Sequence, residues 1–376
     1  MRRSTWISIA VAVLVVVVVS VVIIATRRQP AGAIKLGATF PLTGEVASYG
    51  QKAKRGIEMA VEDVNAKGGM LGRQVVVDFQ DDRGDMKTAV SIFTKFATID
   101  KLPVVFGSAG SGVTLSIAPL ANRHKVVLIS PISSSSKLST EGGPFFFRTV
   151  PADDLQAEVL ANWVHKSGAK SVAVVFTNNS WGKPLADGFE QKFTALGGKV
   201  FLREGVAENT SDFRTIIAKL KDTPNLDAVV SPTYPKEGGI FVRQAKELGL
   251  KVTLFGGDNW GSPEFRNIAG EAAEGVFYTA PAESTSPVYA DFAKRYKTKY
   301  GEEPDVFGPY AYDAAMAVFK AIEAVGSTDA TKIRDALART AFTGASGEIA
   351  FRENGDLRSE AFAKKTIKNG QAIDVR

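Results

Sequence analysis

The sequence predicts an α/β protein with two doubly wound parallel-sheet lobes, and three observations lead to this fold class. The chain has 376 residues, of which 45% are apolar, so it is long enough for two domains with full hydrophobic cores. Short β-branched runs alternate with amphipathic segments, an order typical of parallel sheets covered by helices on both faces. This alternation restarts after the proline-terminated run FRTVP at residues 147–151, which predicts a change of domain there.

Four strands and the helices between them are expected in the first half of the chain. The strands are the β-branched runs at residues 34–40, 75–80, 104–106 and 126–129. After the first strand, a loop is expected over 41–50, and apolar residues from Ala53 to Val64 then share one face of a helix that ends at Gly68. Residues 86–99 are amphipathic in the same way. The resulting β-α-β-α-β-α-β order predicts a parallel sheet.

The same alternation continues through the second half. Further strands are expected at residues 172–176, 200–205, 228–231 and 252–255. Further helices are expected at residues 153–166, 184–196, 213–220, 239–248, 286–300, 309–325 and 331–341. Asp153 is expected to cap the first of these helices. The chain then ends in two expected hairpins, with turns at Asn354-Gly355 and Asn369-Gly370.

Two hydroxyl-rich clusters follow the strands at residues 104–106 and 126–129. The side chains expected to face one crevice are Ser108, Ser111, Thr114 and Ser133 to Ser136. In an open parallel sheet, ligands bind beyond the carboxyl ends of the strands, and a helix N-terminus there favours an anion such as a carboxylate. The alternative is that these residues only cap helices and form turns.

Aromatic residues and a carboxylate follow the strands expected in the second half. Trp181 lies in TNNSWG, Tyr234 in SPTYP, and Asp258 and Trp260 in GGDNWG. A carboxylate among aromatic rings can pair with an ammonium group, and the ring faces add a cation–π attraction of roughly 0.5–2 kcal/mol. Opposite the hydroxyl-rich clusters, such a surface suits a zwitterion. Ordinary packing remains the alternative for each aromatic residue.

Catalysis has little support in the sequence. The two histidines, His124 and His165, lie in or beside helical segments next to lysine, where surface residues are expected. We find no nucleophile elbow with a usable histidine, no phosphate-binding loop and no metal-ligand cluster, so no enzyme, cofactor or metal is expected. The acidic run DDRGD at residues 81–85 lacks the glutamate that completes a cation loop, which favours a solvated turn at Asp81, Asp82 and Asp85.

The charge of the chain gives no reason to expect a nucleic-acid partner. The formal net charge is +6, and the arginine pairs at residues 2–3 and 27–28 supply four of these charges, which leaves +2 for the rest. We also find no basic stripe with interleaved aromatic residues.

Residues 6–25 form an uncharged apolar stretch between the two arginine pairs. Its 20 residues are enough to cross a bilayer core as a helix. The pattern Ala31-Gly32-Ala33 keeps a cleaved secretory signal as the alternative, although it follows Pro30 and the second arginine pair. We therefore expect residues 1–33 to form an N-terminal transmembrane anchor or signal, and the rest to be extracytoplasmic. The absence of cysteine excludes disulfides and lipidation on cysteine.

Three segments resemble the leucine/isoleucine/valine-binding proteins of branched-chain amino acid ABC importers. They are residues 34–82 (IKLGATFPLTGEVASYGQKAKRGIEMAVEDVNAKGGMLGRQVVVDFQDD), 129–131 (ISP) and 267–278 (NIAGEAAEGVFY). The resemblance implies a type I periplasmic-binding fold, in which two lobes joined by three crossovers close on a ligand. One lobe is then expected from residues 34–150 plus 279–358, and the other from 151–278 plus 359–376.

The resemblance also implies which residues hold the polar groups of an amino acid. Ser111 matches the carboxylate site, together with Ser134, which stands where threonine is common. Ile132 matches the position whose backbone carbonyl meets the amino group. Asp258 matches an acidic residue that pairs with the ammonium group.

Aromatic residues complete the implied site. Tyr49 matches an aromatic residue of the first lobe, and Trp181 and Tyr234 match residues of the second lobe that cover the ligand. Three departures affect the side-chain specificity. Trp181 replaces a usual tyrosine, Asp258 is one methylene shorter than glutamate, and Ile132 is larger than the usual small residue.

The expected function is therefore that of a solute-binding protein. It would capture an amino acid, branched-chain or otherwise apolar, and deliver it to an ABC permease in the membrane. The alternative is a ligand-sensing subunit for amino acids or short amides in a signalling system, because receptors use the same fold behind an anchor helix.

Overall fold

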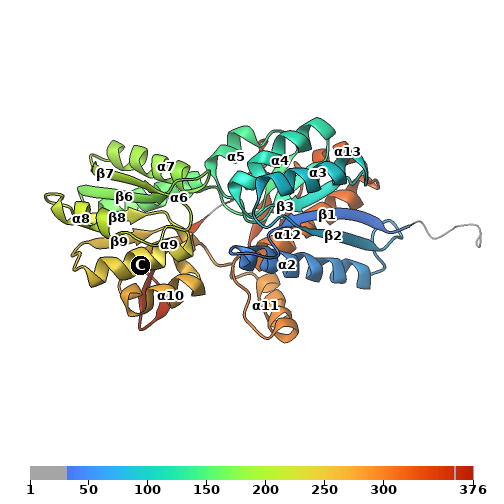
Figure 1. Cartoon of the computed structure of the whole chain (residues 1–376). Helices are drawn as coiled ribbons and strands as arrows, with labels where there is room; N and C mark the ends of the chain where they lie inside the picture. Colours follow the sequence, from blue (N-terminus) through green and yellow to red (C-terminus); the bar gives the residue numbers. More distant parts are fainter. Residues whose placement is uncertain (1–31, 360, 376) are drawn as a thin grey trace, which may run out of the picture.

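Two lobes lie side by side in the computed structural model, which describes residues 32–359 and 361–375 (Figure 1). A five-stranded sheet forms the centre of one lobe and a seven-stranded sheet the centre of the other, and we name the lobes after these sheets. The predicted α/β fold with two parallel-sheet lobes is thus confirmed. The predicted anchor at residues 6–25 lies outside the described residues.

The sheet of the five-stranded lobe is parallel throughout. Its strands lie in the order β2-β1-β3-β4-β5. Their bounds are β1 Ile34–Phe40, β2 Val75–Asp81, β3 Val104–Gly107, β4 Val127–Ser130 and β5 Phe146–Arg148. The chain moves outward from β1 to β2 and then returns to the other side of β1. A crevice forms at such a switch point, beyond the carboxyl ends of the strands.

Helices cover both faces of this sheet. The helices of the lobe are α2 Ala47–Ala66, α3 Met86–Thr98, α4 Ser111–His124, α5 Ser136–Glu141, α11 Pro287–Tyr300, α12 Phe307–Val325 and α13 Ala330–Leu337. Side chains alternate along β3, so that Phe106 joins the core under α2 and α12 while Val105 joins the core under α3 and α4. Gly56 lets α2 and α12 approach closely, because a Cβ there would lie 2.2 Å from the carbonyl oxygen of Gly308.

The sheet of the seven-stranded lobe is mixed. Its order is β14-β13-β10-β9-β8-β6-β7, in which β13 pairs antiparallel with both β10 and β14 and the other pairs are parallel. The bounds are β6 Ser171–Thr177, β7 Lys199–Val206, β8 Ala228–Ser231, β9 Thr253–Gly256, β10 Phe277–Pro281, β13 Phe362–Lys368 and β14 Gln371–Asp374. The predicted hairpin turn at Asn369-Gly370 joins β13 to β14, and both residues have positive φ, as a tight hairpin turn requires.

The helices of the seven-stranded lobe again pack on two faces, around separate apolar cores. They are α6 Asp153–Lys166, α7 Gly182–Ala195, α8 Arg214–Asp222, α9 Pro235–Glu247 and α10 Pro263–Ala269, with short 3₁₀ turns η1 Asp258–Gly261 and η2 Gly270–Ala273. Pro184 and Pro309 lie inside the first turns of α7 and α12, so both helices begin two residues earlier than predicted. Proline is tolerated there because the first amides have no intrahelical partner.

The chain passes between the two sheets three times: between β5 and β6, between β10 and α11, and before β13. In the last passage, before β13, the structure differs from the predicted hairpin. The hairpin expected at Asn354-Gly355 is only an isolated bridge between Phe351 and Leu357, and the hairpin that forms pairs β11 (Ala341–Thr343) with β12 (Glu348–Ala350). Gly355 instead packs on the five-stranded sheet, where its carbonyl accepts a hydrogen bond from the amide of Arg148 at 3.0 Å.

A second correction concerns residues 41–50, which were expected to be a loop. Helix α2 begins at Ala47, so its first turn already lies beside the chain that leaves β1. Gly50 permits this approach, because a Cβ there would lie 2.1 Å from the carbonyl oxygen of Pro41.

Arg148 ties the last crossover to the loop after β4. Its side chain is fully buried and donates to Asp356 Oδ1 at 2.7 Å and to the carbonyl oxygens of Ser134 and Ser135 at 2.8 and 2.9 Å. We expect Asp356→Ala to lower the free energy of unfolding by about 3–5 kcal/mol, because it leaves a buried guanidinium without its carboxylate. Urea denaturation measures this change, with the exposed Glu353→Ala as the matched control. A loss no larger than that of the control would contradict the expectation.

Candidate ligand-binding site

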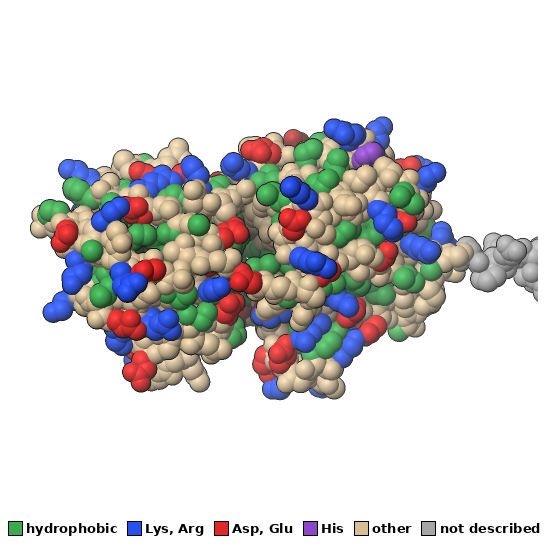
Figure 2. All heavy atoms as spheres, viewed as in Figure 1, with side chains coloured by type: hydrophobic (Ala, Val, Ile, Leu, Met, Phe, Trp, Pro, Cys, Tyr) green, Lys and Arg blue, Asp and Glu red, His purple; other side chains and the backbone are tan. Residues whose placement is uncertain are grey.

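A cavity of about 370 Å³ lies between the two lobes, where Figure 2 shows the surface hollowed. Its volume falls in the range of small-molecule sites in proteins. All seven residues predicted for the ligand site line it: Tyr49, Ser111, Ile132, Ser134, Trp181, Tyr234 and Asp258. Most of them follow the carboxyl ends of β3, β4, β6, β8 and β9. The structure thus brings these residues together, while their contacts with a ligand stay a prediction.

One end of the cavity suits an anion. Helix α4 begins there with Ser111, and Ser111, Gly112 and Val113 all line the cavity. The N-cap residue, Gly110, has no side chain to accept from the first amides of this 14-residue helix. Unpaired amides and the helix dipole together favour a carboxylate at this point. Ser111 Oγ also accepts a hydrogen bond from the amide of Ser135 at 3.2 Å, which joins the two loops.

Three other hydroxyls of the two clusters do not face the cavity, as was expected of them, but support the loops. Ser108, Thr114 and Ser133 are fully buried and do not line the cavity. Ser108 Oγ donates to Asp82 Oδ2 at 2.7 Å, and the hydroxyls of Thr114 and Ser133 lie 2.7 Å apart. These residues hold the loops after β3 and β4 in place, so for them the structural alternative is correct.

The acidic run at residues 81–85 is not a solvated turn throughout. Asp82 is fully buried, and its carboxylate accepts from Thr39 Oγ1 at 3.0 Å and from the amide of Gly84 at 2.9 Å, besides Ser108. Burial raises the pKa of Asp82, while these donors oppose the shift. Asp85 caps α3 through the amide of Thr88 at 2.7 Å. The run therefore supports the loops that form the anion end.

The side of the cavity formed by the seven-stranded lobe suits a cation. Asp258 lines it, and its Oδ1 accepts from Gln156 Nε2 at 3.3 Å. Gln156 Nε2 also donates to Thr279 Oγ1 at 3.0 Å. Burial raises the pKa of Asp258, because little solvent reaches its carboxylate. Among the described residues that line the cavity, none carries a positive charge that could neutralise Asp258.

A second carboxylate, which the sequence analysis missed, lies behind this side of the cavity. Asp153 is 1% exposed, and its Oδ2 accepts from Ser134 Oγ at 3.2 Å. Asp153 Oδ1 and Gln156 Oε1 have no hydrogen-bond partner among the described residues. Burial raises the pKa of Asp153 well above its usual range, and the charge of Asp258 adds to the rise. Asp153 was expected to cap α6, but it is the first helical residue, after the N-cap Ala152.

Aromatic rings close the sides of the cavity. Trp181 and Tyr234 stack with their centroids 5.1 Å apart and their planes 8° apart. Across the cleft, Tyr49 meets Phe307 edge-on at 5.2 Å and donates from its hydroxyl to Asn259 Oδ1 at 2.8 Å. Trp260, the other aromatic candidate, is fully buried and donates to Thr233 Oγ1 at 3.1 Å. For that residue, ordinary packing is correct.

Several contacts join the lobes around the cavity. Besides the bond from Tyr49 to Asn259, Ser135 Oγ donates to the carbonyl of Ser180 at 2.7 Å, and Lys236 Nζ lies 3.3 Å from Glu45 Oε1. These contacts hold the two lobes against each other. A ligand enters or leaves the cavity more freely if they break.

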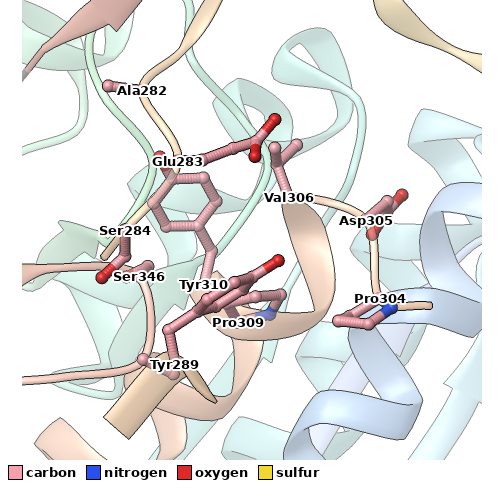
Figure 3. A pocket seen from close by; sticks show the side chains of 11 residues that line it. Ala282, Glu283, Ser284, Tyr289, Pro304, Asp305, Val306, Pro309, Tyr310 and Ser346 are labelled. Carbon is pink, nitrogen blue, oxygen red and sulfur yellow. The ribbon is translucent and has the colours of Figure 1, made fainter. Parts of the chain in front are cut away.

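Two other cavities lie near the crossovers. The pocket in Figure 3 measures about 90 Å³, and its two carboxylates are already paired, Glu283 with Lys365 at 2.9 Å and Asp305 with Lys52 at 2.8 Å. A larger cavity of about 460 Å³ shares Tyr49 and Asp258 with the ligand cavity. Neither combines an open helix N-terminus with an unpaired carboxylate, as the candidate site does.

Neither histidine lines the ligand cavity. His124 is exposed in the last turn of α4, and His165, in the last turn of α6, is only partly exposed, with Nε2 2.8 Å from Lys170 Nζ. Within residues 32–359 and 361–375, no group of three or more metal-binding side chains is arranged to hold an ion. In the same part of the chain, no helix is both long and apolar enough to cross a membrane.

Comparisons with known proteins agree with the fold. Residues 33–370 match the family model described as periplasmic binding protein, and the chain therefore belongs to this family. The Leu/Ile/Val-binding protein BraC3 of Rhizobium johnstonii is 33% identical over 347 residues, which cover 90% of this chain and 93% of the relative.

Two solved structures are similar along nearly their whole length. The leucine-binding protein LivK of Thermotoga maritima superposes with a TM-score of 0.85 at 32% identity, covering 92% of this chain and 98% of LivK. The substrate-binding protein LivJ of Streptococcus pneumoniae, solved with isoleucine, gives a TM-score of 0.83 at 30% identity, covering 91% and 99%. The predicted family resemblance is confirmed.

The raised pKa of Asp153 leads to a prediction about the ligand-free protein. A buried carboxyl whose pKa is raised on folding stabilises the fold fully below its ordinary pKa, and this contribution is lost as the pH rises through the raised value. We therefore expect Asp153→Asn to unfold at a higher temperature than the parent protein at pH 8, with the difference shrinking toward pH 4.

Thermal melts between pH 4 and pH 8 measure this effect. Asp154→Asn is the matched control, because Asp154 is the exposed neighbour on the same helix. A melting temperature of Asp153→Asn below that of the parent at every pH would contradict the assignment.

Proposed function

We propose that this protein is an extracytoplasmic solute-binding protein that captures a branched-chain or other apolar amino acid between its lobes and delivers it to an ABC importer. The observation that carries this proposal is the single cavity with an open helix N-terminus in the five-stranded lobe, Asp258 in the seven-stranded lobe and aromatic rings beside them. Such a cavity complements a zwitterion with an apolar side chain.

The proposed pose follows from these charges. The ligand carboxylate accepts from the amides at the start of α4 and from the hydroxyl of Ser111, and from the hydroxyl of Ser134 once this group turns away from Asp153 Oδ2. The ammonium group pairs with Asp258 and with the backbone carbonyl of Ile132. No cation of the described lining competes for Asp258.

The ligand side chain faces the apolar part of the lining. The residues of this part are Val46, Tyr49, Met86, Val113, Trp181, Tyr234 and Phe307. Burial of a methylene group contributes about 0.8 kcal/mol, so this surface favours aliphatic ligands over small polar ones. The names of BraC3 and LivK, and the isoleucine of the LivJ structure, support the same substrate class.

We also propose the division of the chain that the sequence predicts, with residues 34–150 and 279–358 in one lobe and 151–278 and 359–376 in the other. The distribution of the strands between the two sheets supports it, except at residues 279–281, which end β10 of the seven-stranded sheet. The segment before residue 34 would tether the protein to the outer face of the membrane, with a cleaved signal as the alternative. The N-terminus of the mature protein, determined by mass spectrometry, distinguishes the two.

A ligand screen tests the proposed function directly. We expect leucine, isoleucine or valine to raise the melting temperature, because a ligand that binds only the folded state stabilises it by about 2.7 kcal/mol at one hundred times its Kd. Short amides belong in the same screen, since stabilisation by amides alone would favour the sensing subunit. If no amino acid stabilises the protein and calorimetry detects no binding, the proposal is wrong.

The role of Asp258 gives a sharper test. We expect Asp258→Ala to weaken binding of the amino acid by about 2 kcal/mol or more, roughly 30-fold in Kd, because the ammonium group loses its buried partner. Isothermal titration calorimetry measures this change, and Glu264→Ala, an exposed acid of the same lobe, is the control. If the folded Asp258→Ala protein binds the amino acid as tightly as the control does, the ammonium group does not pair with Asp258.

A further inference from the structure

We propose that Asn179 is the positioning residue of the ligand site: it fixes the stacked rings of Trp181 and Tyr234 and thereby limits the size of the ligand side chain. This inference rests on the proposed function, because it concerns the same cavity. Asn179 lies in the loop between β6 and α7 and lines the cavity with both rings.

The side-chain oxygen of Asn179 holds the start of α7. Its Oδ1 accepts from the amide of Trp181 at 2.9 Å and from the amide of Gly182 at 2.8 Å. Trp181 is the N-cap residue of α7, and its own side chain does not cap the helix. The position of the Trp181 backbone, from which the indole ring projects, thus depends on Asn179.

The side-chain nitrogen of Asn179 holds the second ring. Its Nδ2 donates to Tyr234 Oη at 3.1 Å and to Glu208 Oε1 at 2.6 Å. An asparagine amide has two N–H donors and an oxygen with two acceptor positions, and all four are used here. The orientation of the amide is therefore unambiguous, because the reversed amide would direct N–H groups at the two backbone amides.

The aromatic wall lies apart from the main cores, and besides Asn179 the amide of Tyr234 donates to Thr177 Oγ1 at 3.4 Å. Trp181 packs with Ala157, Leu185 and Tyr234 in a small cluster separate from the main cores of the lobe. The rings stack at 5.1 Å with an angle of 8°, and Tyr234 comes from a different strand-to-helix loop from Trp181. A single residue that bonds to both loops can therefore keep the two rings parallel.

The substitution Asn179→Asp separates the two halves of this role. It retains the oxygen that accepts from Trp181 and Gly182, and aspartate is a good residue at the start of a helix. It replaces the donor with an oxygen, so the bond to Glu208 is lost and two carboxylates come close together. The hydroxyl of Tyr234 must then turn and donate its own proton to stay bonded. Asn178→Asp, at the exposed neighbouring position, is the matched control for the added charge.

We expect Asn179→Asp to raise the Kd for leucine at least ten-fold and to reduce the preference for leucine over phenylalanine at least five-fold, because the loosened wall yields to a larger side chain. Calorimetry measures both ratios. The near-UV circular dichroism of the ligand-free protein should change as the ring pair moves, which a purely global loss of stability would not produce in a folded protein. The control should bind as the parent does.

A double-mutant cycle with Tyr234→Phe completes the test. If Asn179 acts through the tyrosine hydroxyl, the effects of the two substitutions on the Kd for leucine should not add. Full additivity, or an Asn179→Asp protein with unchanged selectivity and an unchanged near-UV spectrum, would overturn the inference. If Asn179→Asp does not fold, Tyr234→Phe alone must change the spectrum and the selectivity, and its failure to do so would also overturn it.

Failure of the proposed function has a different signature. If the parent protein binds no amino acid, the proposed function is wrong, and the ligand-free near-UV spectra of Asn179→Asp and Asn178→Asp still decide whether Asn179 positions the rings.

Discussion

The parallel direction of the strands is the constraint on which the site depends. Because β3, β4, β6, β8 and β9 all run toward the cleft, the loops that follow them meet between the lobes. Those loops carry nearly every polar group of the cavity. A buried network around Arg148 and Asp82 then keeps the loops of the five-stranded lobe in position, without contributing a side chain to the cavity lining.

The electrostatics of the cavity depend on the absence of basic side chains from its described lining. An open helix N-terminus attracts an anion, while Asp258 and the buried Asp153 attract a cation, and no basic side chain of the described lining intervenes. The two carboxyls are held in an environment that disfavours their charged form. A cation bound beside these carboxyls would offset that cost, so cation binding and the ionisation of the two carboxyls would be coupled.

Much of this could be predicted from the sequence, because it depends on local patterns. The strands, most helices and the turn at Asn369-Gly370 follow from periodicity and turn chemistry, and family resemblance led to all seven residues now found around the cavity. Tertiary packing decided the rest. An aspartate in a first helical turn looks the same whether it caps the helix or, like Asp153, is buried behind a ligand site. Likewise, only the packed structure separates the buried hydroxyl of Ser108 from that of Ser111.

The close packing of α2 against α12 has a consequence for how the protein is made. These helices form one wall of the five-stranded lobe, yet α2 lies near the start of the chain and α12 near its end. The core of that lobe therefore stays incomplete until most of the chain has been synthesised, and the seven-stranded sheet likewise waits for β13 and β14. Contacts between distant segments form slowly, because loop closure must come first. A chain that cannot complete either lobe early stays unfolded for longer than one whose lobes are continuous in sequence. Delayed folding suits a protein that crosses a membrane before it folds.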